Sequence, residues 1–331
     1  MSKIREPRLN VMPIEYEWAY DYWFKQENAR WLHTEIPMSD DVNDWMLKMT
    51  DQEKNAIGKI LKGFGQTESH VNEYWSTYVT KWFPVPEIRD MAIAFAAMET
   101  VHTRAYLYLN TTLGLTDFES FLSDDETMAK INLLLEVDPN NETLENIATS
   151  IAVFSACTEG INLFSSFAIL LSFNKPISKN DIIEPRLRGV GKQIEYSVRD
   201  ESLHSEAGCK LFNVLCSENS GLKESVKDRI YEAFDVALKL EFDYINGVMP
   251  EDLPTIKRES LFKFMYHRAN RKLQELGYEA KYELDKSDSE LVKDLQWFYS
   301  VISGEQQTDF FNNRESQYGL PNADWDSEDL F

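Results

Sequence analysis

Glu99-Thr-Val-His102 and Glu201-Ser-Leu-His204 are two copies of one pattern, Glu-x-x-His, about one hundred residues apart in a chain of 331 residues. On a helix, residues i and i+3 lie on the same face, so each pair directs a carboxylate and an imidazole toward one place. Two such pairs, with one carboxylate from each of two further helices, are the set with which a helical bundle holds two metal ions. The pattern alone has little specificity, so the sequence around it decides.

Both motifs lie on the apolar faces of long predicted helices. Around the first motif, apolar residues recur in steps of four and three between Ile88 and Leu109, and around the second they do so between Val190 and Leu215. Burying a lone charge on such a face costs several kcal/mol even after relaxation. A metal ion offsets that cost, so the pattern predicts two helices whose buried faces hold metal ligands.

Two more helical patterns each contain one carboxylate on an apolar face. Thr50-Asp-Gln-Glu53 matches a capping box, and the helix that it opens has Glu68 as the only charge on its apolar face. The run from Ile151 to Phe173 is apolar nearly all round and contains one ionisable carboxylate, Glu159. Its 23 residues are enough to span a bilayer. Because Glu159, Asn162 and several hydroxyl groups interrupt the run, we expect a buried central helix.

Four predicted helices therefore supply six candidate metal ligands: Glu68, Glu99, His102, Glu159, Glu201 and His204. Four carboxylates and two imidazoles form an oxygen-rich set that suits iron or manganese better than a closed thiolate zinc site does. For any one of the six, the alternative is a salt-bridged or hydrogen-bonded core residue. His70 lies on another helix face than Glu68, and His33 and His267 lack comparable surroundings, so these histidines are left out.

The composition favours one large all-α domain. The chain has no Gly/Ser-rich linker, no internal repeat and no strand-rich section, and further helices are predicted at about 225–248 and 256–276. The net charge of −22 argues against a nucleic-acid surface. Three cysteines without a CxxC motif fit a reducing cytoplasm. The first residues contain no hydrophobic signal segment.

These motifs resemble the small (beta) subunit of class I ribonucleotide reductase. The resemblance rests on the six candidate ligands, on Arg199-Asp-Glu-Ser-Leu-His204 and on Glu99-Thr-Val-His-Thr-Arg-Ala-Tyr106, and it extends from about Tyr16 to the C-terminus. It implies a ferritin-like helical bundle with two metal ions per chain in its core. In that family the metal centre generates and stores a one-electron oxidant. A separate large (alpha) subunit receives the oxidant and reduces ribonucleotides to deoxyribonucleotides.

The resemblance also implies an activity and a set of partners. The expected enzyme is a ribonucleoside-diphosphate reductase beta subunit, an oxidoreductase that is active only with its large subunit. The choice between diphosphates and triphosphates would belong to the large subunit. The family further implies a homodimer and allows a flavoprotein activator, and we expect no nucleic-acid or membrane partner.

Four further side chains acquire roles from the resemblance. Tyr106, four residues after His102, takes the place of the radical-bearing tyrosine and should lie close to the metals. Trp31 resembles the tryptophan at the near end of the transfer path, and Glu35 matches an acidic residue often found just after it. Asp200 matches the carboxylate that joins a ligand histidine to this tryptophan, which predicts the order metal, His102, Asp200, Trp31. For Tyr106 and Trp31 the alternative is an ordinary core residue.

A tail is expected to follow the bundle. Residues 1–304 form the predicted ferritin-like radical-generating domain, whereas 305–331 are polar, with Pro, Gly and close-spaced acids that argue against a packed helix. The tail resembles the family's docking peptide for the large subunit, with Tyr318 as the relay tyrosine between subunits. A solubilising acidic end would not need the apolar side chains Trp325, Leu330 and Phe331.

Glu68 departs from the commonest family pattern, in which the first ligand is Asp. Glu at this position resembles the subgroups that keep the oxidant on a manganese–iron or dimanganese centre. Because the manganese–iron subgroup typically has Phe where this chain retains Tyr106, a dimanganese centre is favoured, and diiron or manganese–iron centres stay open. The step from Glu159 to Glu201 is longer than usual, and we assign the excess, without a function, to the loop from Asn174 to Pro185.

Two other classes of protein stay open. Another ferritin-like dimetal enzyme, such as an oxidase, monooxygenase or desaturase, would use the same six ligands on a bound small molecule. It would have no use for Trp31, Asp200 and an aromatic acidic tail together. A non-catalytic metal-binding or storage protein would need neither Tyr106 nor Tyr318.

Overall fold

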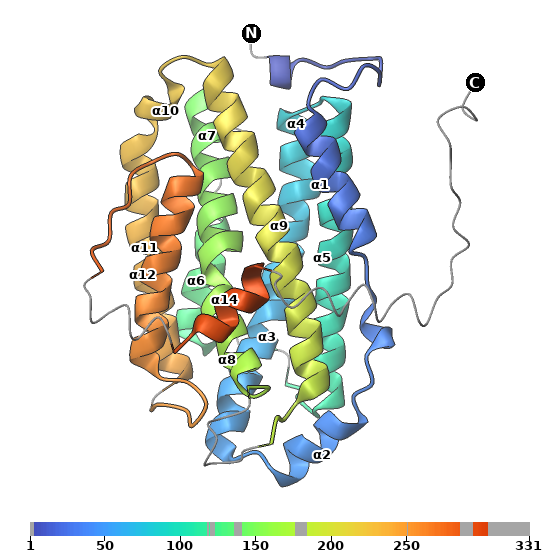
Figure 1. The fold of residues 1–331 in the computed structure, drawn as a ribbon, viewed down its shortest axis with the longest axis vertical. Coiled ribbons are helices and arrows are strands. Elements are labelled where there is room, and N and C mark those ends of the chain that lie inside the picture. The colour runs from blue at the N-terminus through green and yellow to red at the C-terminus, as the bar shows by residue number, and fades with distance from the viewer. Residues whose placement is uncertain are drawn as a thin grey trace, which may run out of the picture.

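Helices make up the architecture of the computed structural model (Figure 1). The structure describes residues 3–117, 119, 123–135, 141–175, 184–249, 251–284 and 294–303. Within these ranges the only β-type pairing is an isolated bridge between Leu253 and Ile256, and no strand is present. The predicted all-α class is confirmed.

The described helices follow one another along the chain, with η1 and η2 as 3-10 helices and η3 and η5 as π-helices. Their bounds are η1 Lys3–Arg5, α1 Glu17–Asn28, η2 His33–Glu35, α2 Ser39–Leu47, α3 Asp51–Glu73, η3 Tyr74–Val79, α4 Thr80–Trp82, α5 Pro86–Thr112, α6 Asp125–Leu135, α7 Leu144–Val153, η5 Phe154–Asn162, α8 Phe164–Ser172, α9 Arg188–Glu218, α10 Leu222–Ser225, α11 Lys227–Val248, α12 Arg258–Glu275 and α14 Gln296–Ser303.

Several helix boundaries agree with the sequence signals. The Thr50 hydroxyl accepts a hydrogen bond from the Glu53 N–H, and the Glu53 carboxylate accepts one from the Thr50 N–H, so the predicted capping box opens α3. The Glu53 carboxylate also pairs with Arg186 at 2.8 Å, which ties the start of α3 to the segment before α9. The helices predicted at about 225–248 and 256–276 are α11 and α12.

The apolar segment forms a continuous helical rod made of α7, η5 and α8. Among the described helices, this rod of residues 144–172 is the one that is long and apolar enough to cross a membrane, and 94% of its most apolar window is buried inside the protein. The predicted buried central helix is therefore confirmed. α9 passes η5 so closely that a Cβ atom on Gly208 would collide with the Ser155 side chain, which explains a glycine within a long helix.

Long helices packed side by side place the site inside the bundle. α5, α9 and the α7–η5–α8 rod run along the long axis of the molecule, and α3 packs against α5 (Figure 1). Aromatic side chains fill much of the space between them, each stabilising the fold by roughly 1.5–3 kcal/mol relative to an exposed position. The largest fully buried ones include Trp31, Trp75, Trp82, Tyr106, Phe95, Phe164 and Phe212.

Candidate metal centre

The structure brings the six candidate ligands together. Glu68 comes from α3, Glu99 and His102 from α5, Glu159 from η5, and Glu201 and His204 from α9, and all six are fully buried. They form two overlapping groups, in each of which one ligand atom per residue lies within 4.8 Å of the others. The first group is Glu68, Glu99, His102 and Glu201, and the second is Glu99, Glu159, Glu201 and His204. Glu99 and Glu201 belong to both groups, so either carboxylate would be available to both ions.

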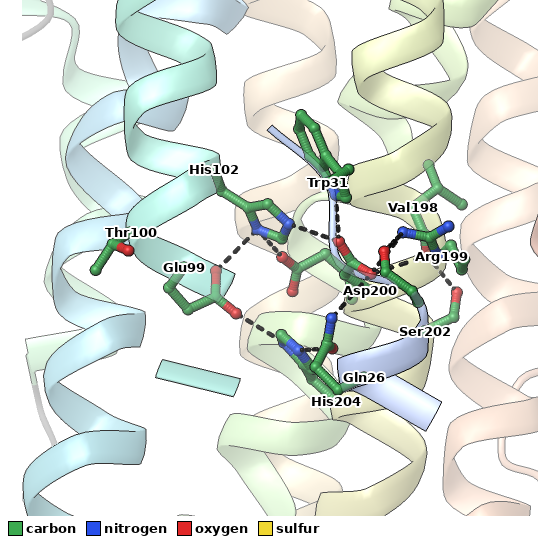
Figure 2. A network of polar contacts seen from close by, with 12 residues as sticks. Gln26, Trp31, Glu99, Thr100, His102, Val198, Arg199, Asp200, Ser202 and His204 are labelled. Atoms are coloured by element: carbon green, nitrogen blue, oxygen red, sulfur yellow. Dashed lines mark hydrogen bonds and ion pairs between the residues drawn. The ribbon is translucent and has the colours of Figure 1, made fainter. Parts of the chain in front are cut away.

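The Glu-x-x-His spacing makes each imidazole face carboxylates. His102 Nδ1 lies 2.9 Å from Glu99 Oε2 on its own helix and 3.0 Å from Glu201 Oε1 on α9. His204 Nδ1 lies 2.7 Å from Glu99 Oε1 across the bundle. Figure 2 shows the two rings converging on the Glu99 carboxylate from α5 and α9. The two motifs therefore meet at one place.

The far nitrogen of each imidazole fixes its tautomer. His102 Nε2 lies 3.1 Å from Asp200 Oδ2, and His204 Nε2 lies 2.9 Å from the side-chain oxygen of Gln26 (Figure 2). Both partners are acceptors, so Nε2 bears the hydrogen in each ring. Nδ1 faces the cluster in both rings and becomes available to a metal ion once it has lost its own proton, which is the arrangement of a metal-ligating histidine with a supporting acceptor behind it.

Burial and mutual repulsion set the protonation of the carboxylates. Burial, followed by repulsion from the neighbouring carboxylates, raises the pKa of Glu68, Glu159 and Glu201 above the usual range. Burial would raise the pKa of Glu99 as well, but the charges of His102 and His204 outweigh it and lower that pKa. Without metal ions, the raised pKa values favour the protonated, neutral form of Glu68, Glu159 and Glu201.

The unpaired oxygen atoms fit a pair of metal ions. Both carboxylate oxygens of Glu68, one of Glu159 and the Oε2 atom of Glu201 have no hydrogen-bond partner among the described residues. Leaving such atoms buried and ionised costs several kcal/mol each. Two divalent ions would offset the four carboxylate charges and coordinate these oxygens. The donor set of carboxylates and imidazoles suits iron or manganese.

Asp200 links the cluster to Trp31. Its Oδ2 atom accepts hydrogen bonds from His102 Nε2 at 3.1 Å and from Trp31 Nε1 at 2.8 Å. Its Oδ1 atom accepts from Gln26 Nε2 at 3.3 Å and pairs with Arg199 at 3.2 Å (Figure 2). Burial opposes ionisation, but the Arg199 charge and the hydrogen bonds lower the pKa of Asp200. The three groups thus stand in the order His102, Asp200, Trp31 that the sequence predicts, joined by an ionised carboxylate.

Tyr106 lies beside the cluster but outside its hydrogen bonds. It is fully buried, and its ring centroid is 6.4 Å from that of His102 and 4.8 Å from that of Phe64. No carboxylate of the cluster forms a hydrogen bond with its hydroxyl among the described residues. Burial raises the pKa of Tyr106 well above its ordinary value, so the phenol is neutral.

The remaining predicted positions fall elsewhere. Glu35 lies exposed in η2. The histidines left out of the ligand set, His33, His70 and His267, do not belong to either ligand group. The predicted residues of the C-terminal segment lie outside the described residues: Tyr318, Trp325, Leu330 and Phe331. Most of the loop from Asn174 to Pro185 lies outside them as well.

Two side chains that contact the cluster had no role in the sequence-based prediction. Gln26 bridges His204 and Asp200 from α1, and Trp75 Nε1 donates a 2.6 Å hydrogen bond to Glu159 Oε1 from η3. Both left a signal. Gln26 is a polar residue that continues the buried stripe of α1, and Trp75 lies two turns after Glu68 on the same predicted face.

Comparison with known proteins gives one consistent family. The family model "Ribonucleotide reductase, small chain" matches residues 8–289. The chain is 28% identical over 343 residues to "Probable ribonucleoside-diphosphate reductase small subunit 376L" of Invertebrate iridescent virus 6, covering 92% of each protein. It is 25% identical over 323 residues to the ribonucleoside-diphosphate reductase subunit beta of Chlamydia pneumoniae, covering 93% of this chain and 89% of that protein.

A solved structure shares the fold. The X-ray structure of dimanganese(II)-NrdF from Streptococcus sanguinis matches with a TM-score of 0.69 and 22% sequence identity, covering 87% of this chain and 99% of that one. The predicted ferritin-like helical bundle is confirmed by this similarity.

Proposed function

Because the chain belongs to the ribonucleotide reductase small-chain family, we propose that it is the radical-generating small subunit of a class I enzyme that reduces ribonucleoside diphosphates. The observation that carries the proposal is the buried six-ligand cluster with a hydrogen-bonded exit through Asp200 to Trp31. An oxidase or a storage protein needs the cluster but has no use for that exit. The substrate class follows the names of the relatives, which are diphosphate reductases.

In this proposal two metal ions per chain occupy the two ligand groups, with Glu99 and Glu201 shared between them. When bound, the ions supply the one-electron oxidant. Glu68 at the first ligand position favours manganese at both sites, and iron at one or both sites is the alternative. The buried phenol of Tyr106 has no carboxylate hydrogen-bonded to it among the described residues, so no such base stands ready to take its proton. That absence favours an oxidant kept on the metals.

Asp200 would position the groups of the exit and hold a proton. Its Oδ2 atom keeps the Nε2 hydrogen of His102 in place, so that Nδ1 remains available as a ligand. The same atom lies 2.8 Å from Trp31 Nε1. An oxidised indole is a much stronger acid than a neutral one, so the Trp31 N–H proton can move to Asp200 as an electron leaves the ring. The ionised state of Asp200 makes it ready to accept that proton.

The partners follow the same proposal. The large subunit would bind the tail of residues 305–331, with Tyr318 as the relay, while residues 1–304 form the radical-generating domain. A homodimer is supported by apolar side chains that α1 and α5 leave exposed, with Tyr20 at 43%, Phe24 at 52% and Ile93 at 51% of their full exposure. A flavoprotein activator and a cytoplasmic location complete the proposal.

Turnover with a large subunit tests this function. Protein loaded with manganese or with iron, and then oxidised, is mixed with a class I large subunit, a ribonucleoside diphosphate and a thiol reductant. We expect deoxyribonucleotide only when both subunits are present, with two metal ions per small subunit by elemental analysis. Metal binding without turnover would favour a storage protein. Oxidation of an added small molecule without the large subunit would favour an oxidase.

A further inference from the structure

A second tryptophan contacts the cluster through the ligand group that Trp31 does not approach. Trp75 Nε1 donates a 2.6 Å hydrogen bond to Glu159 Oε1, and the Trp75 ring lies edge-on to His204 with centroids 6.2 Å apart. Trp31 instead lies beside His102, at 5.9 Å. Trp75 is only 1% exposed, so the contact is shielded from solvent. The function proposed above gives Trp75 no role.

Further oxidisable rings connect Trp75 to the surface. The Tyr74 ring centroid lies 6.3 Å from that of Trp75 and 5.9 Å from that of Tyr78. Trp82 lies 6.0 Å from each of the two tyrosines. Tyr74 and Trp82 are buried, whereas Tyr78 is half-buried and reaches solvent. We name these four side chains, Trp75, Tyr74, Tyr78 and Trp82, the aromatic ladder.

The backbone holds the ladder in place. Tyr74, Trp75 and Tyr78 lie in the π-helix η3, a wider winding that is frequent at functional sites. Tyr74 stacks on Phe154 of the second π-helix, η5, with centroids 3.6 Å apart and planes at 10°, and its hydroxyl is 2.9 Å from Ser150 Oγ. Both partners belong to the rod that supplies Glu159. The rings are therefore fixed relative to the cluster.

Tryptophan and tyrosine side chains are readily oxidised by one electron. In the aromatic ladder, the centroids of neighbouring rings lie 5.9–6.3 Å apart. We propose that the aromatic ladder is a second route for one-electron oxidising equivalents, running from the Glu159 side of the cluster to solvent at Tyr78. It drains the oxidant when no large subunit accepts it through Trp31. This inference rests on the proposed function, because the oxidant is the one that the centre would generate.

The electron balance of the route is simple. Trp75 gives one electron to the oxidised centre, which is reduced by one electron. Tyr78 gives one electron, by way of Tyr74 or Trp82, which restores Trp75, and the phenolic proton of Tyr78 passes to solvent. A low-molecular-weight thiol then returns a hydrogen atom to the Tyr78 radical, and the thiyl radicals from two such events couple to a disulfide. Each event protects the buried ligands from the oxidant at the cost of thiol.

Radical trapping on the activated full-length protein tests the ladder. The protein is loaded with metal and oxidised without a large subunit, in the presence of a nitroso spin trap. The decay of the oxidant is followed by EPR, and the trapped residue is located by peptide mass spectrometry. We expect the adduct on Tyr78. In Tyr78→Phe the adduct should disappear and the oxidant should persist several-fold longer, while turnover with the large subunit stays as in the wild type.

Tyr231→Phe is the matched control, because Tyr231 is half-buried like Tyr78 and lies on α11, outside the ladder. It should change neither the adduct nor the decay. Trp75→Phe provides a second variant and should also lengthen the decay. An oxidant whose lifetime is the same in wild type and Tyr78→Phe, with no adduct on Tyr78, would overturn the ladder alone. Failure of the loaded wild type to form any oxidant would overturn the proposed function, and the ladder with it.

Discussion

Trp31 and Trp75 make the same contact on two sides of one cluster, and the difference lies in the carboxylate that each one meets. Each indole N–H donates to a fully buried carboxylate, at 2.8 Å for Trp31 and 2.6 Å for Trp75. Asp200, the partner of Trp31, belongs to neither ligand group and pairs with Arg199. Glu159, the partner of Trp75, is itself a candidate ligand.

The two carboxylates consequently differ in their capacity to accept a proton. The Arg199 charge and the hydrogen bonds overcome burial and lower the pKa of Asp200, so it is ionised and available. Burial raises the pKa of Glu159, and its charge is neutralised by a proton or by a metal ion. A tryptophan beside a free base can pass on an electron and a proton together, whereas one beside a ligand can pass on the electron alone. The carboxylate that accepts the indole hydrogen bond therefore determines whether each tryptophan can transfer a proton together with the electron.

Removing the metal ions should have the largest effect, because both ligand groups lose their cations. If two sites are each saturated at one hundred times Kd, chelation costs about 5 kcal/mol of folding stability. We expect a large fall in the Tm of the chelated protein, measured by calorimetry, which restored manganese or iron reverses. An unchanged Tm would contradict the assignment of the six ligands.

The pH dependence of the metal-free protein sharpens this test. The folded-state pKa values of Glu68, Glu159 and Glu201 are raised above the unfolded value of about 4.3. The folded state then binds more protons, so stability is greatest below that value and falls as the pH rises through the raised pKa values. Asp200 acts in the opposite sense, because its lowered pKa adds stability that is lost only in acid. The loaded protein should lack the loss at rising pH.

Removing the Asp200 carboxylate, the proposed proton acceptor of Trp31, should nearly abolish turnover. In Asp200→Ala we expect turnover with the large subunit to fall on the order of 10³-fold or more, which is about 4 kcal/mol. The reason is that His102 and Trp31 lose their common acceptor. Elemental analysis should still find two metal ions per chain. Full activity of this variant would refute the relay, and Tyr78→Phe, on the other side, is the control that should keep its turnover.

Shortening the C-terminal tail should weaken binding of the large subunit, which is the proposed electron-transfer partner of the Trp31 side. Deletion of residues 324–331 removes Trp325, Leu330 and Phe331, and a buried apolar side chain contributes roughly 1.5–3 kcal/mol. We expect affinity for the large subunit, measured by calorimetry, to fall by at least about a hundredfold, or 2.7 kcal/mol. Metal content should not change. A truncated chain that still binds and works would refute the docking role of the tail.

Tyr106→Phe should have the smallest effect if the metals hold the oxidant. The phenol is buried without a hydrogen-bonded base among the described residues. We expect a broad multiline EPR signal to survive the substitution, with turnover reduced less than about tenfold, or 1.4 kcal/mol. A narrow organic-radical signal that disappears in the variant would instead place the oxidant on Tyr106 and favour a diiron centre.

The sequence by itself determined the helices and the residues that face inward. The steps of three and four residues around Glu99 and Glu201, the capping box at Thr50 and the apolar run around Glu159 each describe one helix, and a single helix is a local structure. A charge on an apolar stripe demands compensation wherever the helix packs. The candidate ligands could therefore be named before any contact between helices was known.

Only the tertiary structure decided how the helices meet. That Glu99 and Glu201 belong to both ligand groups, and that Gln26 holds His204 while Trp75 holds Glu159, depends on contacts between segments far apart in the chain. The π-helical winding of η3 and η5, which contain Trp75 and Glu159, was likewise not predicted from the sequence. Periodicity reports which face of one helix is buried, but packing chooses which neighbour it meets and at what register.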